Sequence, residues 1–313
     1  MYDMIIIGAG PAGLTAAIYA RRAEKKVLVL EGTTYGGQII KTMKIDNYPG
    51  MPGVSGPDFA KALYMQATSL GAEIEFENVI KTERAGESFK VTTEDDEYEA
   101  KSLIIATGTK YRTLGLEYEK ELEGRGVSYC ATCDGAFYKD KTVVVEGGGN
   151  TALYDAEYLA GICKKVYLIH RRNEFRGDKA LLERVSGLSN VEIITPAAIG
   201  GLLVFAEKMR FLGVWLKETD GETGKVVSDE NVREIKAAGL FVAIGSEPNS
   251  EIFSGLVDRD ERGYIIATED CKTSHPGVFV AGDVRTSGLK QIVTATADGA
   301  NAASKAIDFL NSL

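Results

Sequence analysis

The stretch MIIIGAGPAGLTAAIYARRAEKKVLVLEG, residues 4–32, decides the fold. An apolar run of strand length ends at Gly8, and Gly10 and Gly13 follow before a helical pattern and a second apolar run. Glycines at this spacing permit a tight turn and let backbone N–H groups approach a pyrophosphate at the positive end of a helix. The stretch therefore predicts a βαβ unit that binds a dinucleotide.

The same pattern occurs again in TVVVEGGGNTALYDAEYLAGICKKVYLIHRR, residues 142–172, where Gly147 and Gly149 precede Ala152. Glycine-rich turns also occur in α/β proteins that bind no nucleotide. Two copies, each with strand, helix and second strand in order, favour binding. The sequence predicts an α/β fold with two Rossmann-like dinucleotide-binding domains, the second inserted in the first.

The residues that close the two units differ in charge. Glu31 lies 23 residues after Gly8, where a carboxylate accepts hydrogen bonds from a ribose diol. The equivalent position after Gly147 is His170, and Arg171, Arg172 and Arg176 follow it. Guanidinium groups suit a 2′-phosphate, so the second site is predicted to prefer NADPH to NADH. The alternative is a solvated basic loop.

The order of apolar strands along the chain indicates a split first domain. We expect it to comprise residues 1–112 and 245–313, with a second domain inserted at 113–244. The segments YRTLGLEYE (111–119) and GSEPNSE (245–251) would be the hinges between the domains.

A second acidic residue follows a later strand. In TSHPGVFVAGDV, residues 273–284, Asp283 comes directly after an apolar run and Gly282. A carboxylate in this place can bind hydroxyl groups of a flavin dinucleotide. The alternative is an ordinary turn residue or helix cap.

Composition excludes several classes of function. The net charge of −9 and the lack of a dense basic block argue against nucleic-acid binding. No apolar stretch reaches the length of about 18 residues that indicates a membrane span. We therefore expect a cytoplasmic protein that binds neither nucleic acid nor membrane.

The motif CATCDG places Cys130 and Cys133 two residues apart, with Asp134 directly after them. A four-cysteine zinc site needs a second close pair, but Cys163 and Cys271 are isolated in apolar contexts that suit core residues. The sequence thus predicts no metal site. A C-x-x-C pair favours thiol–disulfide exchange, with Asp134 as the adjacent candidate acid. Two inert buried thiols are the alternative.

Nine segments together resemble the low-molecular-weight, bacterial-type thioredoxin reductases, class II of the pyridine nucleotide-disulfide oxidoreductases. They are GAGPAG (8–13), GGQ (36–38), DNYPG (46–50), ATG (106–108), CATCDG (130–135), GGGNTA (147–152), HRRNEFR (170–176), AGDV (281–284) and KQIVTATADGA (290–300). The likeness covers nearly the whole chain.

The resemblance implies an NADPH-dependent thioredoxin-disulfide reductase, a homodimer with FAD in the split domain and NADPH in the inserted one. It implies that Cys133 faces the flavin, that Cys130 attacks the disulfide of thioredoxin, and that Asp134 handles protons. The FAD contacts it implies are at Gly8, Gly10, Pro11, Ala12, Gly13, Glu31, Gly37, Gln38, Asn47, Gly108, Asp283, Gln291 and Ile292. The NADPH contacts it implies are at Gly147, Gly149, Asn150, Thr151, Ala152, His170, Arg171, Arg172 and Arg176.

The thiol pair must meet both a flavin and a protein partner, so we expect the inserted domain to rotate on its two hinges. Two alternatives remain open: a reductase that takes electrons from ferredoxin, and a redox-silent flavoprotein that acts as a scaffold or sensor. Two features depart from the family pattern. Glu146 places a carboxylate directly before the second glycine run, and residues 194–215 are apolar with little alternation.

Overall fold

The computed structural model describes every residue of the chain except 43, 229 and 231. The chain divides into two compact units. The first unit comprises Met1–Lys110 and Glu247–Leu313, and the second unit comprises Tyr111–Ser246.

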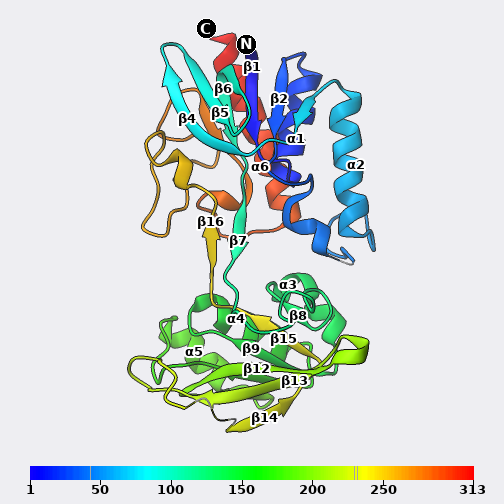
Figure 1. Cartoon of the computed structure of the whole chain (residues 1–313), viewed down its shortest axis with the longest axis vertical. Helices are drawn as coiled ribbons and strands as arrows, with labels where there is room; N and C mark the ends of the chain where they lie inside the picture. The colour runs from blue at the N-terminus through cyan, green and yellow to red at the C-terminus, as the bar shows by residue number, and fades with distance from the viewer. Residues whose placement is uncertain (43, 229, 231) are drawn as a thin grey trace. The chain divides into compact units, whose positions relative to one another are not determined.

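The described part of the first unit is built on a seven-stranded sheet with the order β3–β2–β1–β6–β5–β4, to which β17 adds by pairing with β6. Figure 1 labels β1, β2, β4, β5 and β6 of this sheet. The strands are β1 (Tyr2–Ile7), β2 (Val27–Leu30), β3 (Glu73–Glu75), β4 (Val79–Ala85), β5 (Ser88–Thr93), β6 (Glu97–Ile105) and β17 (Val278–Val280). Strands β3, β2, β1, β6 and β17 are parallel, whereas β4 and β5 pair antiparallel. Residues 4–7 and 27–30 are buried throughout, which explains their continuous apolar sequence.

The described residues of the first unit include three α-helices, α1 (Pro11–Arg22), α2 (Gly56–Ser69) and α6 (Ile292–Asn311). Pro11 stands in the first turn of α1, where its missing N–H costs no helical hydrogen bond. Helix α6 packs closely on α1 through small buried residues, Gly299 among them. A Cβ atom at Gly299 would lie 2.2 Å from the carbonyl oxygen of Ala12, so only glycine fits this crossing.

The second unit contains a parallel sheet which, in the described residues, has the order β11–β10–β9–β15–β8. Its strands are β8 (Val127–Ser128), β9 (Thr142–Glu146), β10 (Lys165–Ile169), β11 (Val191–Ile194) and β15 (Gly239–Val242). The helices α3 (Ala131–Asp134), α4 (Asn150–Ala160) and α5 (Lys179–Ser186) belong to the same unit. One face of β9, through Val143 and Val145, shares a core cluster with α4.

The strands β12 (Ala197–Phe205), β13 (Arg210–Glu218) and β14 (Arg233–Lys236) form an antiparallel meander whose inner face shares a core with β9 and β15. The pairing of β12 with β13 shifts register twice, between Ile199 and Gly201 and between Leu203 and Val204. Each such irregularity changes which side chains face the core. The weak alternation of residues 194–215 therefore reflects bulged strands.

The prediction of an α/β fold with two Rossmann-like domains is confirmed, since each unit has parallel strands of which one, β1 or β9, leads through glycines into a helix, α1 or α4. The chain crosses between the units at β7 (Thr109–Tyr111) and β16 (Ser246–Pro248). These two strands are paired with each other.

We predict that Gly299→Ala lowers the free energy of unfolding of the first unit by about 1–3 kcal/mol, the usual cost of overpacking. The gain in helix propensity, at most about 1 kcal/mol, does not offset a clash with backbone atoms. Urea-induced unfolding would measure the change. Gly255→Ala is the matched control, because a Cβ there would meet no described atom within 4 Å. Equal midpoints for the two variants would contradict the close α1–α6 crossing.

Candidate active site

The first glycine loop brings the end of β1 against the start of α1. Gly8 has φ +109°, and a Cβ at Gly13 would lie 1.9 Å from the carbonyl oxygen of Gly8. Gly10 is different, because a Cβ there would meet nothing within 4 Å among the described residues. The loop thus has no room for a side chain at Gly13, whereas the space next to Gly10 at the N-terminus of α1 is open. An approaching phosphate requires such an open space.

Glu31, directly after β2, lies beside this loop. Its Oε2 accepts a hydrogen bond of 2.8 Å from the backbone N–H of Ala9, and its Oε1 accepts one of 3.1 Å from that of Thr33. These bonds hold the half-buried carboxylate at the edge of the glycine loop. A ribose next to a phosphate on α1 would find its hydrogen-bond acceptor there.

The segment 36–38 covers the same loop. The N–H of Gly36 donates to the carbonyl oxygen of Ala9 at 2.7 Å, and a Cβ at Gly37 would lie 3.5 Å from the Cα of Gly10. Gln38 donates through Nε2 to the carbonyl oxygen and hydroxyl of Thr109. Its Oε1 is buried without a hydrogen-bond partner among the described residues.

Asp283 lies in a short turn, Gly282–Val284, that packs against α1. A Cβ at Gly282, whose φ is +78°, would lie 3.0 Å from that of Ala12. Burial raises the pKa of Asp283, and the nearby Lys290 ammonium opposes that rise. The turn places Asp283 beside the first glycine loop, although Asp283 and Gly13 are 270 residues apart in the sequence.

An ion pair between Asp298 and Arg285 holds this turn in place. Asp298 of α6 accepts a hydrogen bond of 3.1 Å from the N–H of Gly282 and one of 2.8 Å from Nη1 of Arg285. Both side chains are largely buried. Neither residue was predicted from the sequence, because nothing in the local pattern distinguishes a buried ion pair from a solvated one.

Asn47 and Gln291 meet across 244 residues of sequence through a hydrogen bond of 2.9 Å from Nδ2 to Oε1. Gln291 also caps α6 in a capping box with Thr294, which places Ile292 in the first turn of the helix. Gly108 has φ +65° and its carbonyl oxygen accepts from the N–H of Asn249 at 3.0 Å.

The second glycine loop repeats the first. A Cβ at Gly147 would lie 2.4 Å from the carbonyl oxygen of Ala243, whereas one at Gly149, the N-cap of α4, would meet no described atom within 4 Å. Ala152 is fully buried behind the loop. Asn150 and Thr151 open α4, and Oδ1 of Asn150 accepts a hydrogen bond of 2.7 Å from the N–H of Asp178.

The basic segment 170–176 folds onto this loop, since the N–H of Arg176 donates to the carbonyl oxygen of Gly148 at 2.8 Å. Arg171 and Arg176 are exposed, and Arg172 is half-buried. A hairpin beyond β13 braces the segment, because Thr219 Oγ1 donates to the carbonyl oxygen of Arg171 at 2.8 Å. The backbone of the basic segment is therefore held against the second glycine loop and against the hairpin.

His170 differs from the arginines that follow it. It is only 5% exposed, and its ring fills the space next to Gly148, where a Cβ would lie 2.1 Å from the imidazole. Its Nε2 lies 3.1 Å from the carbonyl oxygen of Glu174. Burial lowers the pKa of His170, with the neighbouring arginines acting in the same direction. The ring supports the loop from beneath, and its contact with a nucleotide stays a prediction.

Glu146 is 4% exposed and ends β9. Its register partners Ile169 and Val242 belong to the core under the meander, so its side chain lies on the face of the sheet opposite α4. Burial raises the pKa of Glu146 to about 8, with Arg171 opposing the rise. This shift favours the neutral carboxyl group, which carries no negative charge near the glycine loop.

Cys130 and Cys133 are joined by a disulfide bond. Cys130 precedes the short helix α3, and its carbonyl oxygen accepts hydrogen bonds from the N–H groups of Cys133 (3.3 Å) and Asp134 (3.1 Å). Burial is the main reason that the pKa of Asp134 is raised, while a 2.7 Å hydrogen bond from Ser128 lowers it. The two sulfur atoms and the acid thus share one short loop.

The other two cysteines, Cys163 and Cys271, are buried as free thiols. Burial raises the pKa of Cys163 to about 11 and that of Cys271 to about 12, so both keep their protons and are poor nucleophiles. Within the described residues, no group of three or more His, Cys, Asp and Glu side chains is placed to share a metal ion. None of the described helices has the length and apolarity needed to span a bilayer.

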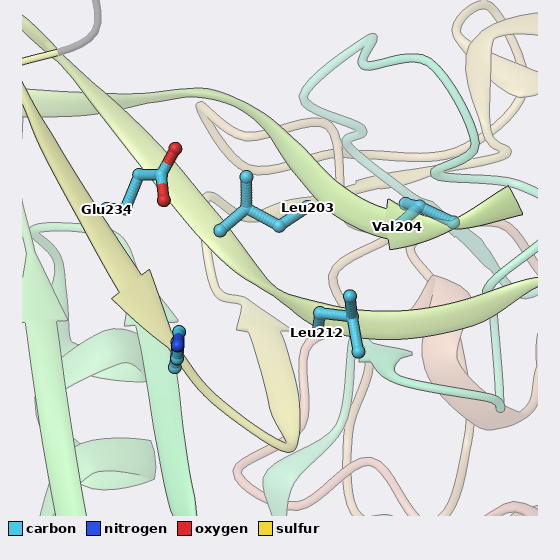
Figure 2. A pocket seen from close by; sticks show the side chains of 5 residues that line it. Leu203, Val204, Leu212 and Glu234 are labelled. Atoms are coloured by element: carbon cyan, nitrogen blue, oxygen red, sulfur yellow. The ribbon is translucent and has the colours of Figure 1, made fainter.

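A pocket lies apart from these groups, on the meander of the second unit. Figure 2 shows Leu203 and Val204 of β12, Leu212 of β13 and Glu234 of β14 around it, and Lys236 completes the lining. None of these residues belongs to a glycine loop or to the thiol segment, so the pocket has no part in the candidate site.

Comparisons with known proteins agree with this geometry. The family of pyridine nucleotide-disulphide oxidoreductases matches residues 2–299. Thioredoxin reductase of Peptoclostridium acidaminophilum is 41% identical over 307 residues, covering 98% of this chain and 96% of the relative. That of Listeria innocua is 39% identical over 314 residues, covering 100% of this chain and 95% of the relative.

The crystal structure of thioredoxin reductase from Streptococcus pyogenes superposes with a TM-score of 0.91 at 39% identity, over 100% of this chain and 99% of that one. Family and fold thus agree along the full length of both chains. This chain belongs to the pyridine nucleotide-disulphide oxidoreductase family.

Proposed function

We propose that this chain is a thioredoxin reductase that uses NADPH and FAD. The observation that carries the proposal is the Cys130–Cys133 disulfide with Asp134 beside it, in a unit that also holds a dinucleotide-type glycine loop. Relatives about 40% identical over nearly their whole length are named thioredoxin reductase.

FAD is assigned to the first unit. The open N-terminus of α1 suits a pyrophosphate, and Glu31 would accept hydrogen bonds from the adenosine ribose. Asp283 would bind hydroxyl groups of the ribityl chain. The orphaned Oε1 of Gln38 would gain a donor, and the Asn47–Gln291 pair would lie beside the ring system.

NADPH is assigned to the second unit. Its pyrophosphate would lie over Gly149 at the N-terminus of α4, where backbone N–H groups are unpaired within the helix. The exposed Arg171 and Arg176 would bind the 2′-phosphate that distinguishes NADPH from NADH. The protonated Glu146, on the other face of the sheet, would not repel it.

Bound FAD would supply the means to accept a hydride from NADPH and to release an electron pair to a disulfide. The chain's own residues then perform the exchange with thioredoxin. The thiolate of Cys130 attacks one sulfur of the partner's disulfide, that bond breaks, and a mixed disulfide forms. Cys133 attacks the mixed disulfide, which releases the reduced partner and restores the Cys130–Cys133 bond, while Asp134 exchanges protons with the thiols.

We predict that replacing both Arg171 and Arg176 by alanine raises KM for NADPH by about tenfold or more, since each lost charge-assisted hydrogen bond is worth about 1.5–3 kcal/mol. KM for NADH should stay unchanged. Anaerobic bleaching of the flavin absorbance would measure both. Arg184→Ala is the control, because this exposed arginine pairs with Glu157 on helices of the same unit. Equal effects on both nucleotides would refute 2′-phosphate recognition.

A second prediction concerns the thiol relay. Cys133→Ser should leave flavin reduction by NADPH intact and abolish reduction of thioredoxin, because a single thiol cannot release the mixed disulfide. Stopped-flow absorbance would follow the first step and an insulin-reduction assay the second. Cys163→Ala, which removes a buried inert thiol, should keep full turnover. Turnover of the Cys133 variant would refute the relay, and failure of NADPH to bleach the flavin would favour a ferredoxin-dependent enzyme.

The proposal includes rotation of the second unit between two working arrangements. The chain crosses between the units only at the paired segments β7 and β16 in its described part, which is a suitable hinge. Homodimer formation and a cytoplasmic location are further parts of the proposal that rest on the family, and sedimentation and cell fractionation would test them.

Rotation predicts two states of energy transfer between dyes placed on the two units. Met65→Cys on α2 and Glu183→Cys on α5 offer exposed attachment sites. The native thiols are either disulfide-bonded or buried, so they would not compete for the label. The transfer efficiency should change when NADPH is added and revert with oxidised thioredoxin. A single constant efficiency during turnover would contradict rotation.

A further inference from the structure

Ser128, the last residue of β8, is 3% exposed and connects the acid to the thiol loop. Its Oγ lies 2.7 Å from Oδ2 of Asp134, to which it donates. The same oxygen accepts from the N–H of Cys130 at 3.1 Å and lies 3.3 Å from the carbonyl oxygen of Cys130. One buried hydroxyl therefore contacts both Asp134 and the backbone on each side of the Cys130 side chain.

This arrangement satisfies both protonation states of Asp134. A hydroxyl carries one proton and two lone pairs. When Asp134 is ionised, the Ser128 hydroxyl donates to the carboxylate. When Asp134 is protonated, the carboxyl group donates to Oγ, and the serine proton turns to the carbonyl oxygen of Cys130. No group in the network loses its partner when the proton leaves or returns, so the usual penalty for an unpaired buried polar group is avoided.

We propose that Ser128 is a positioning residue that keeps Asp134 hydrogen-bonded in both protonation states while this acid exchanges a proton with the Cys130–Cys133 pair. The inference rests on the proposed function and deepens it. Ser128 contacts the backbone of Cys130 and acts on the thiol pair through Asp134.

The proton balance follows from the proposed cycle. NADPH supplies a hydride, which is two electrons and one proton. The proton passes to solvent, and the two electrons break the Cys130–Cys133 bond and leave two thiolates. Asp134 gives its proton to one of them, so that one thiol, one thiolate and the Asp134 carboxylate result. During exchange the thiolate attacks the partner's disulfide, the remaining thiol returns its proton to Asp134, and the second sulfur closes the enzyme disulfide. The partner leaves as a dithiolate that solvent protonates.

The surroundings of Asp134 also affect its titration. Burial raises its pKa, the Ser128 hydrogen bond lowers it, and the negative charge of Glu123 raises it. Tyr138 lies close enough for its own pKa to be raised in part by Asp134. Helix α4, which packs against α3, contributes Tyr158 beside Gly135, and Asp155, whose pKa burial raises to about 7. Removing the serine hydroxyl thus moves the pKa of Asp134 upward.

Ser128→Thr and Ser128→Val form the matched pair, because they have the same shape and only threonine keeps the hydroxyl. The holoenzyme would be reduced with dithiothreitol, desalted and mixed with 5,5′-dithiobis(2-nitrobenzoate) over pH 5.5–8.5. We expect the Ser128→Thr variant to keep the wild-type midpoint of the rate's acid limb. Ser128→Val should move this midpoint upward by about one pH unit, because one hydrogen bond to a charged group is lost.

The Asp134→Asn background separates positioning from structure. There the Thr and Val variants should have the same pH profile, because residue 134 no longer titrates and only the thiols do. A shift that persists in Asp134→Asn, or equal midpoints for Thr and Val with Asp134 present, would overturn the proposal. An equivalent comparison in Asp155→Asn should retain the shift, which excludes Asp155 as its source.

Two measurements keep the test decisive. Circular dichroism and flavin absorbance would show whether Ser128→Val folds, and Ser128→Ala replaces it if it does not, with the same expected shift. Because 5,5′-dithiobis(2-nitrobenzoate) is itself a disulfide, its reaction reports thiol–disulfide exchange without NADPH or thioredoxin. Failure of the wild type to reduce thioredoxin would therefore count against the proposed function, while the Thr–Val comparison would still decide the role of Ser128.

Discussion

Close approach of backbone to backbone, where a parallel strand turns into a helix, is the constraint on which both units depend. A Cβ atom at Gly13 would lie 1.9 Å from the carbonyl oxygen of Gly8, and one at Gly147 would lie 2.4 Å from that of Ala243. No other residue type permits these distances. Because the turns are so tight, the N-termini of α1 and α4 stay uncovered, and each unit presents an anion site at the carboxyl edge of its sheet.

The polar groups around the first loop are held by partners distant in sequence. Glu31 is hydrogen-bonded to Ala9, and Gly282 is held by Asp298, whose charge Arg285 balances in a largely buried pair. Such a pair contributes little net stability but makes the position of its members well defined. For a site that must orient a cofactor, a defined position matters more than stability.

In the thiol loop, too, a few neighbouring groups determine how a functional side chain behaves. Asp134 is close to Cys130 in sequence, yet its protonation is governed by burial, by Glu123 and by the Ser128 hydroxyl. Glu146 and Asp134 are both buried acids with raised pKa values, but they differ in their partners. Asp134 has a hydroxyl that serves either protonation state, whereas Oε2 of Glu146 has no hydrogen-bond partner in the described structure. Only the former is equipped to exchange a proton.

Local sequence patterns alone determined the fold class, the two glycine loops and the reactive pair, because strand period, helix period and glycine spacing act within about 30 residues. The family resemblance, which those motifs carry, extended this to the candidate residues. What only the tertiary structure decided is which side chains meet and which face they take. The Asn47–Gln291 hydrogen bond spans 244 residues, His170 turns beneath its loop while Arg171 faces out, and Glu146 lies opposite α4. Such outcomes depend on the path of the whole chain and on the burial it imposes, and burial is the main cause of the raised pKa of both Glu146 and Asp134.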